Sequence, residues 1–185
     1  MPDPPDLKSA SSLPSQIFLG QDTCRKLWDD MSGTLLPSWV GRVPRCVGNG
    51  KHKKLSADQW KVLVTIHLPI TLVPLWAGSG IFSDLLENFL DLVKALRLAT
   101  SHKVTKESIA AYEQIYDNYL KKMCTIFPQA TVTPTQHAGT HFGLFLRNFG
   151  PSREYNCFPF ERMNHLCQQV KTNRRPGVSH QHGMA

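Results

Sequence analysis

The chain has 185 residues, 41% of them hydrophobic, which is enough for one compact domain with a core and argues against wholesale disorder. Its formal net charge of +7 favours anionic partners, nucleic acid first. Its five cysteines are odd in number, widely spaced and without a C-x-x-C motif, so the composition predicts a reduced, intracellular chain without a disulfide framework.

The two ends of the sequence differ in composition from its middle. Residues 1–21 are rich in proline and serine and lack the basic and apolar segments of a secretory signal, so we expect a disordered lead-in. Residues 178–185 are expected to form a disordered tail. The folded part should therefore be residues 22–177. The protein is expected not to be secreted, and the nucleus is one candidate location.

Hydrophobic spacing predicts a mainly α fold without useful β-strands. A first helix is expected over residues 22–34, followed by an irregular basic connector, "LLPSWVGRVPRCVGNGKHKKL". The next helix should begin at Ala57 with Ser56 as its N-cap, and it should kink or end near Pro69 or Pro74.

Further helices are predicted from capping residues and apolar stripes. Ser83, Thr105 and Thr133 are expected as N-caps of three helices. The helix after Thr133 should run through "HAGTHFGLFLRNF" and stop at Gly150. A last helix is expected to begin near Pro159.

Residues 62–82 contain no charged side chain and are nearly long enough to span a bilayer. Two prolines and two glycines interrupt this run, which favours shorter, buried pieces. A helical membrane protein anchored by residues 62–82 is therefore kept only as an alternative, and no membrane partner is expected.

His137 and His141 are four residues apart, so on a helix both can face one ion. One interpretation is a pair of zinc ligands, which is half of a structural site because zinc takes four ligands. The alternatives are two histidines hydrogen-bonded in a core, or one buried and one exposed. The spacing alone does not decide among them.

Glu161 follows Phe158-Pro159-Phe160 and would lie in the first turn of the last helix. A carboxylate there could bind a catalytic Mg²⁺, although such a site usually needs more than one carboxylate. The alternative is that Glu161 stabilises the N-terminus of the helix or pairs with a nearby cation.

Two basic clusters are candidate nucleic-acid contacts, because lysine and arginine side chains can neutralise phosphates; the alternative is a solvated surface. Trp39 and Trp60 flank the first cluster and could stack on bases or belong to the core. The clusters are Arg42, Arg45, Lys51, Lys53 and Lys54, and Lys171, Arg174 and Arg175.

Two blocks of the sequence together resemble CACTA-type (En/Spm-like) DNA transposases. Residues 36–76 are similar to a family segment in which "LP…P…G…GKL-ADQW" precedes an apolar helix, and residues 133–177 are similar to its C-terminal region, in which a histidine pair leads to "GP…W…(F/Y)P(F/I)ER…L…N…PG". The matching positions are Leu36, Pro37, Gly50, Lys54, Leu55, Ala57, Asp58, Gln59, Trp60, His137, His141, Gly150, Pro151, Phe158, Pro159, Phe160, Glu161, Arg162, Asn173, Pro176 and Gly177.

The resemblance implies a helical fragment of a ribonuclease-H-like transposase. That family uses an Asp-Asp-Glu triad that holds two Mg²⁺ ions, and this chain matches the helical insertion and the end that carries the last Glu. Glu161 matches that carboxylate. His137 and His141 match a histidine pair that holds Zn²⁺ together with a C-x-x-C. The two aspartates and the C-x-x-C have no counterpart in these 185 residues, so no cofactor is expected here.

The first hypothesis is therefore a truncated, transposase-derived protein that does not cut DNA by itself. Its expected partners are DNA, through nonspecific phosphate contacts, and a full-length transposase. The second hypothesis is a small basic helical module that binds nucleic acid or protein. Salt-dependent DNA binding would separate this module from an inert relic.

Overall fold

The computed structural model describes residues 20–48, 55–155, 163–164 and 166–167, and in these ranges the chain is mainly helical, with no β-strand, as predicted. The predicted lead-in up to residue 19, the tail and the start of the last helix lie outside these ranges. The elements are α1 (Gln21–Gly33), α2 (Ala57–Val62), the π-helix η1 (Leu63–His67), α3 (Leu68–Trp76), the 3-10 turn η2 (Gly80–Phe82), α4 (Ser83–Ala99), α5 (Lys106–Ile126), α6 (Pro134–Thr140), α7 (Phe142–Phe149) and the 3-10 turn η3 (Ser152–Glu154).

Side-chain caps begin three of these helices. Ser56, Thr105 and Thr133 each accept a hydrogen bond from the backbone N–H three residues on, and each forms a reciprocal capping box. These three predictions are confirmed. Ser83 was expected to cap α4, but it is the first residue of that helix. The chain enters α4 directly from η2, so Phe82 is the N-cap and no side-chain bond forms there.

The helix that starts at Ala57 was predicted to kink or end near Pro69 or Pro74, and its last segment ends at Trp76, two residues past Pro74. α2, η1 and α3 follow one another without a break, and Pro69 and Pro74 both lie within α3. The wider π-helical turn comes just before Pro69, whose ring lacks a backbone N–H, and the helix continues past it. Within the described ranges no helix has both the length and the apolar character that crossing a bilayer requires.

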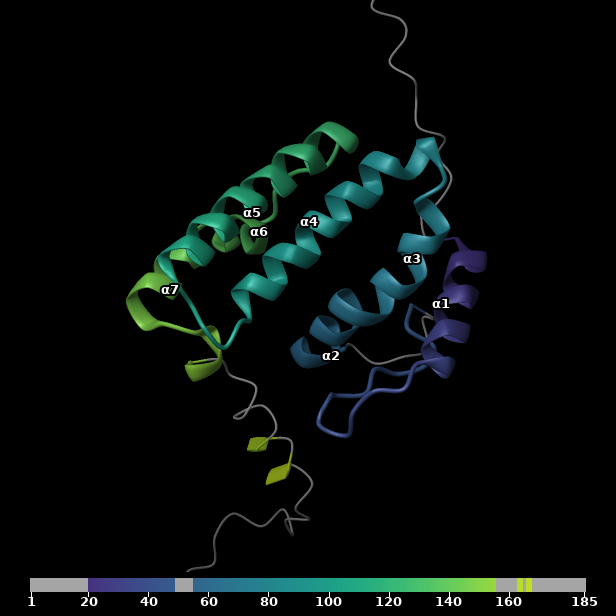
Figure 1. The fold of residues 1–185 in the computed structure, drawn as a ribbon, viewed down its shortest axis with the longest axis horizontal. Helices are drawn as coiled ribbons and strands as arrows, with labels where there is room; N and C mark the ends of the chain where they lie inside the picture. Colours follow the sequence, from purple (N-terminus) through teal and green to yellow (C-terminus); the bar gives the residue numbers. More distant parts are fainter. Residues whose placement is uncertain (1–19, 49–54, 156–162, 165, 168–185) are drawn as a thin grey trace, which may run out of the picture.

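The helices form a row in which α4 lies between α3 and α5 (Figure 1). α4 and α5 pack against each other along their lengths, α1 covers α3 on one side, and α6 and α7 cover α5 on the other. Three buried clusters join neighbouring elements: Leu27, Met31, Val43, Val62 and Leu63; Leu72, Trp76 and Leu86; and Ala95, Ala99 and Tyr112.

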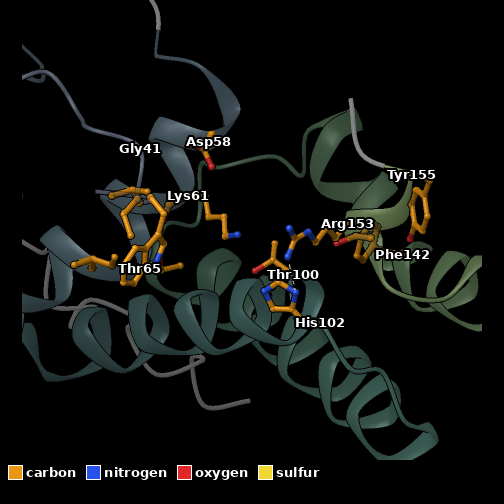
Figure 2. Close-up of a pocket in the computed structure, with 14 residues that line it drawn as sticks. Gly41, Asp58, Lys61, Thr65, Thr100, His102, Phe142, Arg153 and Tyr155 are labelled. Atoms are coloured by element: carbon orange, nitrogen blue, oxygen red, sulfur yellow. Dashed lines mark hydrogen bonds between the residues drawn. The ribbon is translucent and has the colours of Figure 1, made fainter. Parts of the chain in front are cut away.

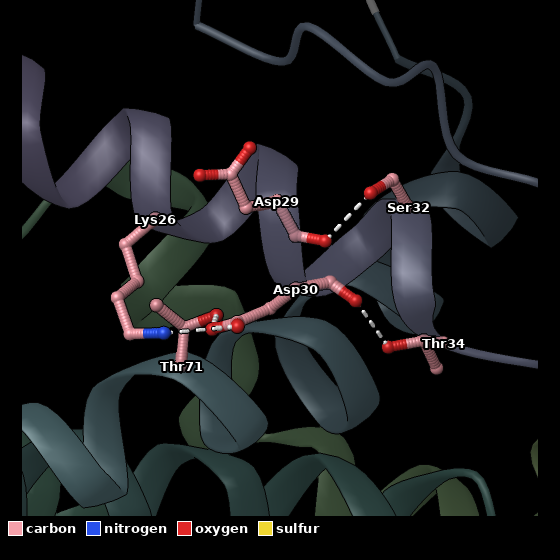
Figure 3. A network of polar contacts seen from close by, with 6 residues as sticks. All are labelled: Lys26, Asp29, Asp30, Ser32, Thr34 and Thr71. Carbon is pink, nitrogen blue, oxygen red and sulfur yellow. Dashed lines mark hydrogen bonds and ion pairs between the residues drawn. The ribbon is translucent and has the colours of Figure 1, made fainter.

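A polar contact attaches α1 to α3 (Figure 3). The hydroxyl of Thr71, a fully buried residue, donates to Asp30 Oδ2 at 2.8 Å, and Lys26 Nζ lies 3.1 Å from Asp30 Oδ1. The Thr71 hydrogen bond is the main reason that the pKa of Asp30 lies below its usual range, and Lys26 adds to it. Asp30 is therefore held as a carboxylate at the junction between the two helices.

The segment after Thr133 was expected to form one helix, and it forms two. α6 ends at Thr140 and α7 begins at Phe142, with His141 between them. At this break, hydrogen bonds between residues three apart replace the α-helical bonds between residues four apart. His141 N donates to Ala138 O at 3.1 Å, and Leu144 N donates to His141 O at 3.0 Å. The end at Gly150 is confirmed: its φ of 76° is a conformation that glycine adopts readily.

Candidate functional site

Two tyrosines of α5 set the orientation of residues 137–141, the HAGTH segment. Tyr112 Oη donates to the carbonyl of Gly139 at 2.8 Å, and Tyr116 Oη donates to the carbonyl of Gln136 at 3.0 Å. The backbone of Gly139 lies so close to the Tyr116 ring that a Cβ there would come within 2.6 Å of Cζ. Gly139 therefore faces α5, and the opposite side of α6 faces solvent.

His137 and His141 both lie on that solvent-facing side. Their Nε2 atoms are 3.3 Å apart, their ring centroids are 5.0 Å apart, and both side chains are exposed. The prediction that the pair shares one face is confirmed, and the two core alternatives are wrong. No group of three or more potential metal ligands is present among the described residues, so the structure brings together a pair of imidazoles only.

Several predicted site residues lie outside the described ranges, and the structure does not place them. They are the candidate carboxylate Glu161, the connector lysines Lys51, Lys53 and Lys54, and the C-terminal cluster Lys171, Arg174 and Arg175.

Arg42 and Arg45 are the predicted phosphate contacts that the structure does place, and both are exposed on the connector. Gln59 Nε2 donates to the carbonyl of Arg42 at 3.2 Å, and the buried Val43 belongs to the first core cluster. The connector is thus attached to α2 while its arginine side chains point into solvent. Trp60, which could have been core, is 52% exposed.

A cleft of about 830 Å³ lies between the connector with α2 and η1 on one side and the region where α4, α7 and η3 meet on the other. Its volume is within the range of small-molecule and cofactor sites. Trp39 lines the cleft and is 84% exposed, so the packing does not use its ring. Lys61, His102 and Arg153 supply the basic and donor groups of the cleft.

The η3 turn places Arg153 at the cleft. Gly150 ends α7, and the buried Ser152 hydroxyl donates to the carbonyl of Ala99 at 2.7 Å. This bond fixes η3 on the C-terminal end of α4. Arg153 Nη1 then lies 3.0 Å from His102 Nδ1, in the turn that follows α4.

The Arg153–His102 contact determines which ring nitrogen of His102 is protonated. A guanidinium has only donors, so His102 Nδ1 is the acceptor and the neutral ring carries its proton on Nε2. Arg153 therefore keeps its positive charge, and His102 keeps a free N–H donor. Figure 2 shows the amino end of Lys61 and the guanidinium of Arg153 directed toward each other across the cleft, with Thr100 and His102 beside them.

The cations of the cleft differ from those of the helix interfaces in their partners. Lys122 contacts Glu87 at 2.8 Å and Asp91 at 3.0 Å, and these hydrogen bonds raise the pKa of its ammonium. Carboxylates also lie within ion-pair distance of Arg25, Lys26, Lys94, Lys121 and Arg147.

By contrast, some described cations have no carboxylate partner among the residues that the structure places. They are Arg42, Arg45, Lys61, Arg97, Lys103, Lys106 and Arg153. Lys61 and Arg153 line the cleft, Arg42 follows the lining residue Gly41, and Lys103 follows His102.

Asp58 also lines the cleft, with its carboxylate packed against the backbone of Gly41. It is the one carboxylate among the described lining residues, and it lies outside ion-pair distance of Lys61. The cleft therefore has one described carboxylate, beside the connector, while Lys61 and Arg153 approach from its two sides (Figure 2), and the space between these cations suits an anionic group.

Sequence reasoning did not find Lys61, His102 and Arg153 as a group. They are separated by 41 and 51 positions and share no motif, so only the folded chain brings them together. The signal in the sequence was the aromatic residue Trp39 next to a basic segment. Comparisons with protein-family models, curated proteins and solved structures found no match to this chain.

Proposed function

We propose that this chain is a helical nucleic-acid-binding module derived from a CACTA-type transposase. One observation carries the binding part of the proposal: Lys61 and Arg153 converge on one cleft without a carboxylate partner among the described residues. Cations placed in this way are free to neutralise phosphates. The exposed Arg42 and Arg45 extend the basic surface along the connector.

The transposase origin is supported by the two sequence blocks and by their order. The helical fold of the described residues is what the helical insertion of such an enzyme would contribute, because the sheet of a ribonuclease-H-like fold lies in other segments. Origin and binding are separate parts of the proposal. DNA binding can be tested directly on the purified chain.

The proposed module does not cut DNA by itself. Two divalent ions held a few ångströms apart repel each other, and several carboxylates are needed to offset this repulsion and to fix the geometry. Glu161 is the one position in these 185 residues that matches a carboxylate of the family triad. Binding without strand cleavage is therefore the expected activity.

Fluorescence anisotropy with a short labelled DNA duplex at several salt concentrations tests the proposal. Binding should weaken as salt is added and should differ little between sequences, because phosphate contacts dominate. Lys61→Gln and Arg153→Gln should each weaken binding and reduce the slope of log K against log salt by about 0.9 per lost phosphate contact. Combined neutralisation of Lys51, Lys53 and Lys54 should act in the same direction on every sequence.

Lys121→Gln is the matched control, because it removes the same charge from an exposed residue that pairs with Asp117 within α5. It should leave the affinity nearly unchanged. An equal loss for Lys121→Gln and Lys61→Gln would mean that only the net charge matters. Tight, salt-insensitive and sequence-selective binding would also contradict the proposal.

A further inference from the structure

We propose that the cleft holds one unpaired nucleotide of a single strand, with its phosphate at Lys61, His102 and Arg153 and its base on Trp39. This inference rests on the proposed nucleic-acid binding and makes it more specific. It assigns the stacking of a base on Trp39 to single-stranded nucleic acid, whereas the phosphates of either form can contact the cations of the cleft and the basic surface around it.

The cations and His102 of the cleft supply the donors that a phosphate requires. Lys61 brings an ammonium, Arg153 brings a guanidinium, and His102 brings its Nε2–H, since its Nδ1 accepts from Arg153. The three groups come from α2, from the turn after α4 and from η3. Such a convergence of donors from separate elements favours a localised anion over a diffuse counterion layer.

The aromatic side chain explains why the anion should be a nucleotide. Trp39 is 84% exposed, lines the same cleft as the cations, and makes no ring contact with another described aromatic residue. An indole with a free face beside a phosphate site can stack on a base, as single-strand-binding proteins do. Binding of a phosphate ion alone would not involve the Trp39 ring.

The size of the cleft suits a single unstacked nucleotide. Its volume of about 830 Å³ exceeds what a phosphate ion would fill, and Trp39 lines it together with the cations. Asp58 lies beside Gly41 of the connector, where its carboxylate disfavours a second phosphate and can accept a hydrogen bond from a base amino group. A paired base inside a duplex cannot present its face to Trp39, so the site discriminates between single and double strands.

The test compares the binding of a single-stranded DNA oligonucleotide with that of a duplex of the same length, using the full chain. Trp39→Ala should weaken single-strand binding roughly 5- to 150-fold and should leave duplex binding nearly unchanged. Trp39→Phe should keep most of the affinity, because phenylalanine also stacks. Trp60→Ala is the matched control, since Trp60 is exposed but does not line the cleft.

The outcomes separate the inference from the proposed function. If neither DNA form binds, both fail. If both forms bind and Trp39→Ala weakens them equally, or weakens neither, the inference fails and the proposed function stands. Competition with the mononucleotide dAMP distinguishes a strand from a free nucleotide: dAMP binding as tightly as the oligonucleotide would overturn the assignment to a strand. Unchanged circular dichroism of each variant excludes a loss of folding.

Discussion

Substituting His137 by alanine should remove a weak zinc site at the junction of α6 and α7. Two Zn–N bonds of about 2.05 Å that meet at a tetrahedral angle span about 3.3 Å. The Nε2 atoms of His137 and His141 are 3.3 Å apart, and both rings are exposed and free to turn toward one ion. The pair therefore has the spacing that zinc requires, although it supplies only two of four ligands.

The expected affinity follows from this half-complete shell. A complete structural zinc site contributes about 10–16 kcal/mol, so half of its ligands should contribute about 5–8 kcal/mol. This range corresponds to a Kd between about 1 μM and 0.2 mM. Zinc should therefore bind when it is present in excess over the protein, and it should dissociate readily when a chelator is added.

Isothermal titration with zinc, followed by dialysis against a chelator, measures both properties. Because the chain has eight histidines, the difference between wild type and His137→Ala is the quantity to compare. His102→Ala serves as the control, since it removes a histidine outside the pair. A full equivalent of zinc that resists the chelator and disappears in His137→Ala would refute the reasoning, because it would require further ligands from outside the described residues.

Three other changes test the stability of the fold and the absence of catalysis. Thr71→Val should lower the free energy of unfolding by about 1–2 kcal/mol in urea denaturation, because Asp30 loses a buried donor while the packing volume is kept. Burial lowers the pKa of His67. The free energy of unfolding of the wild type should therefore fall as the pH drops below about 6.5, because the unfolded chain then takes up a proton that the folded chain resists. His67→Leu should reduce this pH dependence between about pH 7.5 and 5.5. Purified protein should show no Mg²⁺-dependent nuclease activity, and Glu161→Gln should change nothing in the same assay.

The helix starts could be predicted because capping depends on local sequence. A threonine or serine three residues before a suitable partner can satisfy the first backbone donors without help from the rest of the fold. Thr105 and Thr133 cap their helices in this way. Ser83 has the same residue type, but the preceding η2 turn already directs the chain into α4, and local sequence does not reveal that turn.

The break at His141 and the cleft depend on contacts between distant segments. The hydroxyl of Tyr112 reaches the carbonyl of Gly139 across 27 positions, and nothing in the spacing of HAGTH indicates this bond. Similarly, Ser152 places η3 through a bond to Ala99 that spans 53 positions. The i, i+4 spacing of the histidine pair was sufficient to predict a shared face, because the tighter turn at the break preserves their proximity.

The distribution of ion pairs separates the cations that stabilise the fold from those available to a ligand. Arg147 binds Glu113 through two hydrogen bonds of 2.7 and 2.6 Å and so joins α7 to α5. Arg153, only six positions later, contacts His102 Nδ1 and faces a cleft. A carboxylate beside Arg153 would add little stability at an exposed site, but it would cancel the charge there. The lack of a carboxylate partner among the described residues therefore costs the fold little and leaves the Arg153 charge available, as a phosphate-binding site requires.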